Sequence, residues 1–104
     1  MNTSANKYDA LEQLIIEENL RIQKVDFHKD LDLIIIVLNT KAVLKQKLST
    51  YTKLKEATNE QLSEYKLIAD GIGVSWPELD EDLSLKGFLQ DELRALVTKN
   101  PIAA

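Results

Sequence analysis

The sequence predicts an α+β fold from three observations. Apolar residues near both ends of the chain recur at helical spacing, whereas those in the middle alternate with a period of two. Residues 69–84 also gather two of the three glycines, the only tryptophan and one of the two prolines. We therefore expect an N-terminal helix, a three-stranded antiparallel meander, a short helix, a glycine-rich extended segment and a C-terminal amphipathic helix. A chain of 104 residues fits a single domain, residues 1–104.

The N-terminal helix is expected over residues 4–19. Tyr8, Leu11 and Ile15 follow the spacing that places apolar side chains on one face. Ser4 or Asn6 can cap the first turn with a side-chain oxygen. The acidic residues of this segment are expected to face water.

The meander is expected over residues 21–48. Residues 33–38 are apolar on both faces, which is typical of a central strand covered on both sides. The polar run 28–30 is expected to connect the first two strands. Asn39, which tolerates the left-handed conformation, is expected to turn the chain into the third strand.

The third strand is expected to be half-solvated. Its alternation turns Ala42, Leu44 and Leu48 inward. Lysines on such a strand are also the usual protection against edge-to-edge aggregation. The outward-facing residues are Lys41, Val43, Lys45 and Lys47.

A capping box predicts the short helix. The Thr58 hydroxyl can accept from the Gln61 backbone amide, while the Gln61 side chain can accept from the Thr58 backbone amide. We therefore expect the helix to begin here and to run to about Tyr65. Residues 49–57 are expected to form a loop or a short turn. Tyr51 in that segment is either an exposed contact residue or a cover for the core.

The last helix is expected to begin after Ser84, whose hydroxyl can cap it, and to end at Pro101. Its apolar residues follow i, i+3, i+4 spacing and so form one continuous stripe. They are Leu85, Phe88, Leu89, Leu93, Leu96 and Val97.

The two glycines of the rare-residue segment are expected to shape a turn or a bulge. Gly71 and Gly73 form a Gly-x-Gly, but a phosphate loop needs a further glycine or Gly-Lys-Ser and a helix that starts at once. Trp76 is expected to pack against the sheet with its ring nitrogen bonded to an acceptor; stacking on a ligand is the alternative.

The acidic residues that follow have three interpretations. Asp80 and Asp82 share one side of an extended segment and can contact a cation weakly, but the spacing of a calcium-binding loop is absent. We expect them to precede the last helix, whose N-terminus favours carboxylates. They can also accept from backbone amides of the preceding loop. The expected structural signature of the fold is therefore Gly71, Gly73, Trp76, Asp80, Asp82 and Ser84.

Catalytic and metal chemistry has little support in the sequence. The chain has no cysteine, which excludes disulfides, thiolate metal sites and a cysteine nucleophile. His28, the only histidine, is expected in a surface turn, where a metal site would need Asp26 or Asp30. An enzyme would need His28 to meet Asp80 and Asp82 in one pocket. We therefore expect no enzyme, no metal and no cofactor.

The formal net charge of −4 makes free-standing nucleic-acid binding unfavourable, because phosphate attraction supplies most non-specific affinity. The N-terminus lacks the basic-then-apolar order of a signal peptide. The longest apolar run, residues 33–38, is far shorter than the roughly 20 residues that span a bilayer. We expect a cytoplasmic protein.

The rare-residue segment also carries a family resemblance. Residues 57–61 read Ala-Thr-Asn-Glu-Gln, residues 76–84 read Trp-Pro-Glu-Leu-Asp-Glu-Asp-Leu-Ser, and Gly-Phe-Leu follows at 87–89. Over residues 22–90 the chain resembles the uncharacterised bacterial family called domain of unknown function 2442. The resemblance implies a small α+β domain, often encoded beside other small proteins in toxin–antitoxin or regulatory pairs.

We therefore expect a small non-enzymatic interaction or regulatory protein, antitoxin-like or an accessory partner of a neighbouring gene product. Acidic and apolar surface would cover a basic active site. The expected contacts are the N-terminal helix, through Glu12, Glu17 and Glu18, or the later acidic run of Glu78, Asp80, Glu81 and Asp82. The partner is another small bacterial protein or a second copy. The alternative is a nucleic-acid-binding regulator, which requires one basic cluster to converge on one face. That cluster is Lys41, Lys45, Lys47, Lys53 and Lys55.

Overall fold

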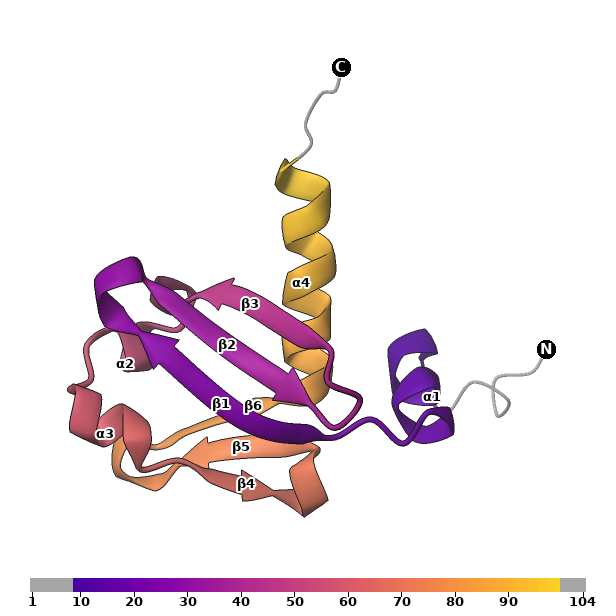
Figure 1. Ribbon diagram of the computed structural model, residues 1–104, viewed down its shortest axis with the longest axis horizontal. Helices are drawn as coiled ribbons and strands as arrows, with labels where there is room; N and C mark the ends of the chain where they lie inside the picture. The colour runs from indigo at the N-terminus through magenta and orange to yellow at the C-terminus, as the bar shows by residue number, and fades with distance from the viewer. Residues whose placement is uncertain (1–8, 100–104) are drawn as a thin grey trace.

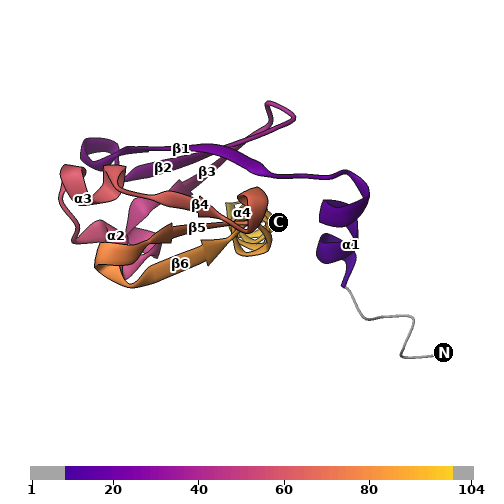
Figure 2. The same cartoon turned by 90° about the horizontal axis from the view of Figure 1, so that it is seen from below.

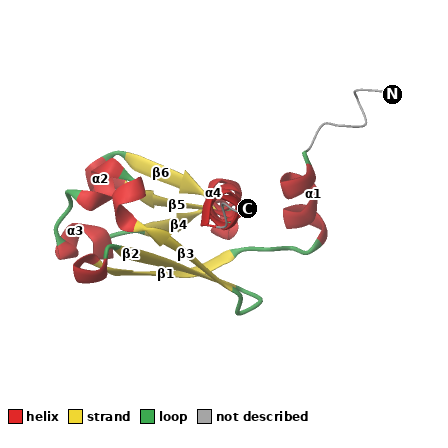
Figure 3. Cartoon of the chain, turned by 90° about the horizontal axis from the view of Figure 1, so that it is seen from above, coloured by secondary structure: helices red, strands yellow, loops and turns green. Residues whose placement is uncertain are grey.

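The computed structural model describes residues 9–99 and confirms the α+β class. Within that range the strands form two three-stranded antiparallel sheets, which lie as two layers (Figures 2 and 3). The short helices α2 (Thr52–Lys55) and α3 (Asn59–Ser63) lie at one end of the layers. Helices α1 (Ala10–Glu17) and α4 (Leu85–Lys99) lie at the other end.

The first sheet is the predicted meander, with strand order β1-β2-β3. Its strands are β1 (Ile22–His28), β2 (Leu33–Leu38) and β3 (Val43–Lys47). The apolar strand β2 is central, as its sequence predicts, and its residues are alternately buried and half-buried. The apolar character of both of its faces therefore reflects one fully buried face and one partly covered face.

The turn between β2 and β3 differs from the prediction. Lys41, not Asn39, takes the left-handed conformation, with φ 78°. The Asn39 side chain instead accepts from the Arg21 amide at 3.0 Å and donates to the Asn19 carbonyl at 2.9 Å. Asn39 therefore ties the turn to the segment that precedes β1.

The inward face of β3 is also partly mispredicted. Leu44 and Leu48 are buried as expected, but Ala42 is exposed because it lies in the turn before the strand. The position between the two leucines belongs to Gln46, which is buried and donates its side-chain amide to Glu92 Oε1 at 2.9 Å. A polar side chain is tolerated there because it has a hydrogen-bond partner.

The glycine-rich segment is more than one extended stretch. It forms a second meander of order β4-β5-β6, with β4 (Lys66–Ile68), β5 (Gly73–Trp76) and β6 (Glu81–Ser84). The expectation that Asp80 and Asp82 directly precede the last helix is wrong, because strand β6 lies between the turn and the helix.

The same kind of turn connects β1 to β2 and β5 to β6. Each is a single 3₁₀ turn, Lys29–Leu31 or Pro77–Leu79, followed by a left-handed aspartate. Asp32 has φ 54° and Asp80 has φ 53°. Aspartate is one of the few residues other than glycine that adopts this conformation routinely. The shared Leu-Asp pair therefore marks the end of both connections.

The helix starts confirm two predicted caps and correct a third. Thr58 and Gln61 form the predicted capping box of α3, and Ser84 Oγ accepts from the Gly87 amide of α4 at 2.9 Å. Helix α1 begins later than expected, because Asp9 is its cap and forms a capping box with Glu12. The predicted caps Ser4 and Asn6 lie outside the described residues.

Both sheets contribute to one hydrophobic core. Trp76 of β5 is 1% exposed, and its indole nitrogen donates to the Leu62 carbonyl at 3.0 Å, which confirms its predicted packing role. Tyr65, just before β4, accepts from the Val25 amide of β1 at 3.2 Å and so joins the two sheets. Tyr51 covers the core: its ring meets Phe88 edge-on, with centroids 5.8 Å apart.

Candidate interaction surface

The structural-signature residues divide into buried and exposed positions. Gly71 takes φ 91° in the turn before β5, as expected, whereas Gly73 lies inside β5. A Cβ atom on Gly73 would lie 3.2 Å from Ile68 Cγ1 and from the Leu83 carbonyl oxygen, so close packing is the reason for this glycine. The structure assigns these glycines to the fold.

Asp80 and Asp82 lie on the surface, in the turn and in strand β6. The contact made at Asp80 uses its backbone carbonyl, which accepts from Lys53 Nζ at 2.8 Å. His28 ends β1, where it lines a shallow depression with Asp30 and Asn59. Asp82 lines a different depression. The structure therefore does not bring the side chains of His28, Asp80 and Asp82 together. Among residues 9–99, no group of three or more His, Asp or Glu side chains is arranged to hold a metal ion.

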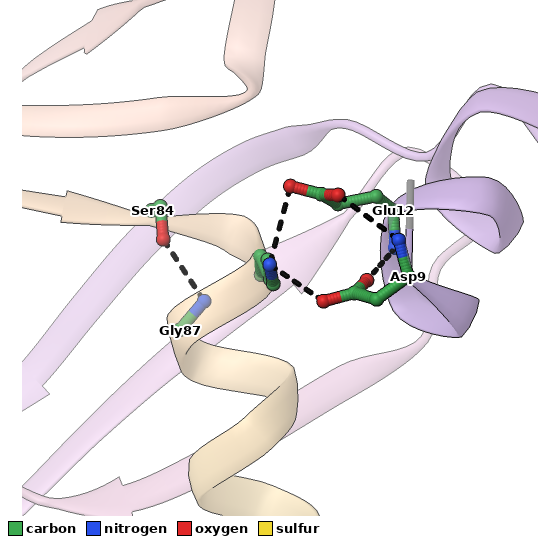
Figure 4. A network of polar contacts seen from close by, with 5 residues as sticks. Asp9, Glu12, Ser84 and Gly87 are labelled. Carbon is green, nitrogen blue, oxygen red and sulfur yellow. Dashed lines mark hydrogen bonds and ion pairs between the residues drawn. The ribbon is translucent and has the colours of Figure 1, made fainter. Parts of the chain in front are cut away.

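Helix α1 is held against the start of α4 by Lys86. Its ammonium lies 2.7 Å from Asp9 Oδ2 and 3.2 Å from Glu12 Oε2. Figure 4 shows both carboxylates turned toward the first turn of α4. The hydrogen bond from Lys86 lowers the pKa of Asp9, and the hydrogen bond to Asp9 in turn raises the pKa of Lys86. Ile15, which is buried, adds an apolar contact from α1 to the core.

The three predicted partner-binding glutamates therefore have different surroundings. Glu12 is engaged by Lys86 and by the capping box of its own helix. Glu17 and Glu18, at the C-terminal end of α1, are exposed. The Glu17 carboxylate accepts from Gln13 Nε2 at 2.9 Å. The latter two glutamates remain accessible to a partner.

The second half of α4 extends beyond both sheets (Figure 1). Leu85 and Phe88 in its first turn are fully buried, and Leu89 is partly buried. The same apolar stripe then continues into solvent: Leu93 is 52% exposed, Leu96 59% and Val97 76%. Burial and the Asp91 carboxylate together raise the pKa of Tyr51, whose hydroxyl donates to Asp91 at 2.6 Å and anchors the middle of the helix. We call Leu93, Leu96 and Val97 the α4 stripe.

The basic cluster does not gather on one face. Lys41 lies in the β2–β3 turn and donates to Gln23, while Lys53 of α2 contacts Asp80 and Glu81. Lys55 is also on α2. Two members, Lys45 and Lys47, share the exposed face of β3. The structure therefore brings together two of the five lysines.

Sequence reasoning missed Lys86 and Tyr51 as residues that position the two helices at this end of the molecule. Neither has a local signal, because their partners lie 74 and 40 residues away in the chain. The exposure of the α4 stripe was also not predicted, although its helical spacing was. Among residues 9–99, the structure contains no helix that is both long and apolar enough to cross a membrane.

The structure is a small α+β domain in which two antiparallel meanders share one core with a C-terminal helix. The chain belongs to the family described as protein of unknown function DUF2442, whose model matches residues 22–92. This confirms the resemblance seen in the sequence, and the match leaves out α1 and most of the projecting half of α4.

Two solved structures are similar to this chain. The solution structure of an uncharacterized protein from Chromobacterium violaceum is 28% identical in sequence and has a TM-score of 0.64; the match covers all of both chains. A crystal structure of a protein of unknown function from Rhodospirillum rubrum is 25% identical and has a TM-score of 0.59; the match covers 68% of this chain and 86% of that one. No curated protein matches the chain.

Proposed function

We propose that the protein is a small non-enzymatic interaction protein, antitoxin-like or accessory, that binds a basic protein encoded beside it. The observation that supports this function best is the α4 stripe, which stands in solvent on a projecting helix. Soluble proteins bury most such helical stripes, and an apolar face left open on a helix is typical of a protein-binding site. Helix α4 would lie in a groove of the partner with the stripe as its anchor.

The charge of the molecule supports a basic partner. The chain carries a formal net charge of −4, and the exposed Glu17 and Glu18 lie on α1, which packs beside α4. A negative rim next to an apolar anchor raises the rate at which a positively charged protein associates. Leu14 and Ile16 of α1 are further apolar side chains in solvent, 45% and 56% exposed.

The test is co-expression with each neighbouring gene product, followed by affinity purification and titration calorimetry. The variant Leu93→Ser/Leu96→Ser removes two anchors. We expect it to weaken binding at least about tenfold, because two apolar side chains at a helix-in-groove contact contribute more than about 1.4 kcal/mol. Leu67→Ser/Ile68→Ser, on strand β4 of the second sheet, is the matched control, since both side chains are 39% exposed and β4 lies on the side of the molecule opposite the projecting half of α4 (Figure 1).

The proposal fails if no neighbouring product binds, or if the α4 variant binds as tightly as the control. Salt-dependent retention of DNA or RNA that is lost on changing Lys45 and Lys47 would support the nucleic-acid alternative instead.

A further inference from the structure

A groove lies where the exposed face of the first sheet meets α4. It has a volume of about 580 Å³, and its lining includes Leu31, Leu33, Lys45, Lys47 and Ala95. Asp32 also lines it, and its carboxylate accepts from the Ser49 amide and hydroxyl. Leu31 is 66% exposed although it is a large apolar residue in a short connection. The groove therefore combines an apolar wall with two ammonium groups that project from alternate positions of β3.

The two lysines of the groove differ from most other lysines of the protein. Within residues 9–99, the side chains of Lys45 and Lys47 have neither an ion pair nor a hydrogen bond, whereas Lys86 and Lys53 have both. Protection of the edge strand β3 against aggregation explains these two lysines only in part. The edge is already partly covered, because Glu92 of α4 accepts from the Lys45 backbone amide at 3.3 Å. Two adjacent, unpaired positive charges beside an apolar wall fit an acidic amphipathic segment.

The chain itself carries such a segment. On α1, Leu14 is followed at i+3 and i+4 by Glu17 and Glu18, so an exposed leucine and two exposed carboxylates share one side of the helix. These carboxylates lie at the C-terminal end of α1, where the helix dipole disfavours negative charge, and the last turn has no basic residue. Local helix stability therefore does not explain them.

We infer that α1 of a second copy of this chain docks in the groove, with Leu14 against Leu31 and with Glu17 and Glu18 facing Lys45 and Lys47. Both halves of the complementarity come from exposed residues of the same chain. The contact joins two different surfaces and is therefore heterologous, so it forms a ring or an open chain unless a two-fold axis closes it. This self-association goes beyond the proposed function and requires no other protein.

Sedimentation velocity on the purified full chain, from about 10 μM to about 1 mM, tests this contact directly. The average mass is expected to rise with concentration, and to rise less at high salt because the contact is partly ionic. Lys45→Glu/Lys47→Glu is expected to weaken self-association at least about tenfold, since two attractive pairs become repulsive. Glu17→Lys/Glu18→Lys should weaken it similarly, and the four changes combined should restore it.

The matched control is Lys55→Glu/Lys66→Glu, which changes the net charge equally at two exposed lysines away from the groove. It should leave self-association close to that of the unmodified chain. Circular dichroism verifies that each variant is folded. A protein that stays monomeric over the whole range, a control pair that acts as strongly as the groove pair, or a combined variant that does not recover would each overturn the inference. None of these results depends on whether the α4 stripe binds a partner.

Discussion

Gly71 and Gly73 show how one residue type serves two physical purposes within three positions. Gly71 combines a φ of 91° with lack of space, since an added Cβ would lie 2.9 Å from the Ile22 carbonyl oxygen. Gly73 has no unusual φ, and its nearest obstacles include the Ile68 side chain, which is 39% exposed and able to move. The first glycine is needed for conformation and packing, the second for packing alone.

Gly71→Ala is therefore expected to lower the free energy of unfolding by about 1–3 kcal/mol, the usual cost of a strained left-handed residue. Gly73→Ala should cost less, because the Ile68 side chain can adjust. Urea unfolding followed by Trp76 fluorescence measures both. A Gly71→Ala variant more stable than Gly73→Ala would contradict the assignment.

Helix α1 is attached to the domain through few contacts. Ile15 supplies its one buried side chain, and Lys86 supplies the ionic contact with Asp9 and Glu12. Asp9 serves both as cap of α1 and as partner of Lys86. Loss of its charge therefore weakens the helix start and the docking together.

We expect the docking of α1 to depend on pH at both extremes. The pKa of Asp9 is lowered from 3.8 in the folded protein, so its contribution is present above about pH 3.8 and is lost as the pH falls through the lower folded value. The pKa of Lys86 is raised from 10.5, so its contribution is present below that pH and is lost as the pH rises through the folded value.

Lys86→Gln should weaken this docking at neutral pH, which amide hydrogen exchange at Ile15 would report as faster exchange. Lys66→Gln, at an exposed lysine on β4, is the matched control and should leave that rate unchanged. Equal protection of Ile15 in the two variants would show that Lys86 does not hold the helix.

At the scale of the whole molecule, the two sheets are one cooperative unit because a single core lies between them. Trp76 of the second sheet is buried in that core, and its ring lies 6.2 Å from that of Tyr65, whose hydroxyl reaches β1. The strands of the second sheet have three or four residues each, too few to shield a separate core, so this sheet depends on packing against the first.

Trp76→Phe is expected to lower the free energy of unfolding by about 2–4 kcal/mol, because it removes core volume and leaves the Leu62 carbonyl without its donor. Thermal unfolding by circular dichroism should remain a single transition. Hydrogen exchange that opens Val74 of β5 well before Ile36 of β2 would show instead that the sheets unfold separately.

The parts of the fold that were predictable depend on short-range signals. The apolar composition of residues 33–38 predicts a central strand, and the caps at Thr58 and Ser84 involve residues within one helical turn. The second meander was missed because β4 has three residues, all exposed, and β5 has four, which is too few to show a period. The Leu-Asp pair shared by both 3₁₀ turns was the available signal.

The candidate surface was predictable to a smaller extent. The exposure of Glu17 and Glu18 follows from their place on an amphipathic helix, but the engagement of Glu12 depends on a lysine far away in the chain. Likewise, the helical spacing of Leu93 and Leu96 predicts one face and does not tell whether a sheet covers it.

The α+β class, the first meander, the caps of α3 and α4, and membership of the family could all be predicted from the sequence, because each depends on neighbouring residues or on a contiguous pattern. Three features became visible only in the folded molecule: the acidic run after Trp76 forms a turn and then strand β6, α1 is held by Lys86, and α4 extends beyond the sheets. These features depend on where separate elements end in space. Burial and ion pairing are consequences of that placement, which no local spacing encodes.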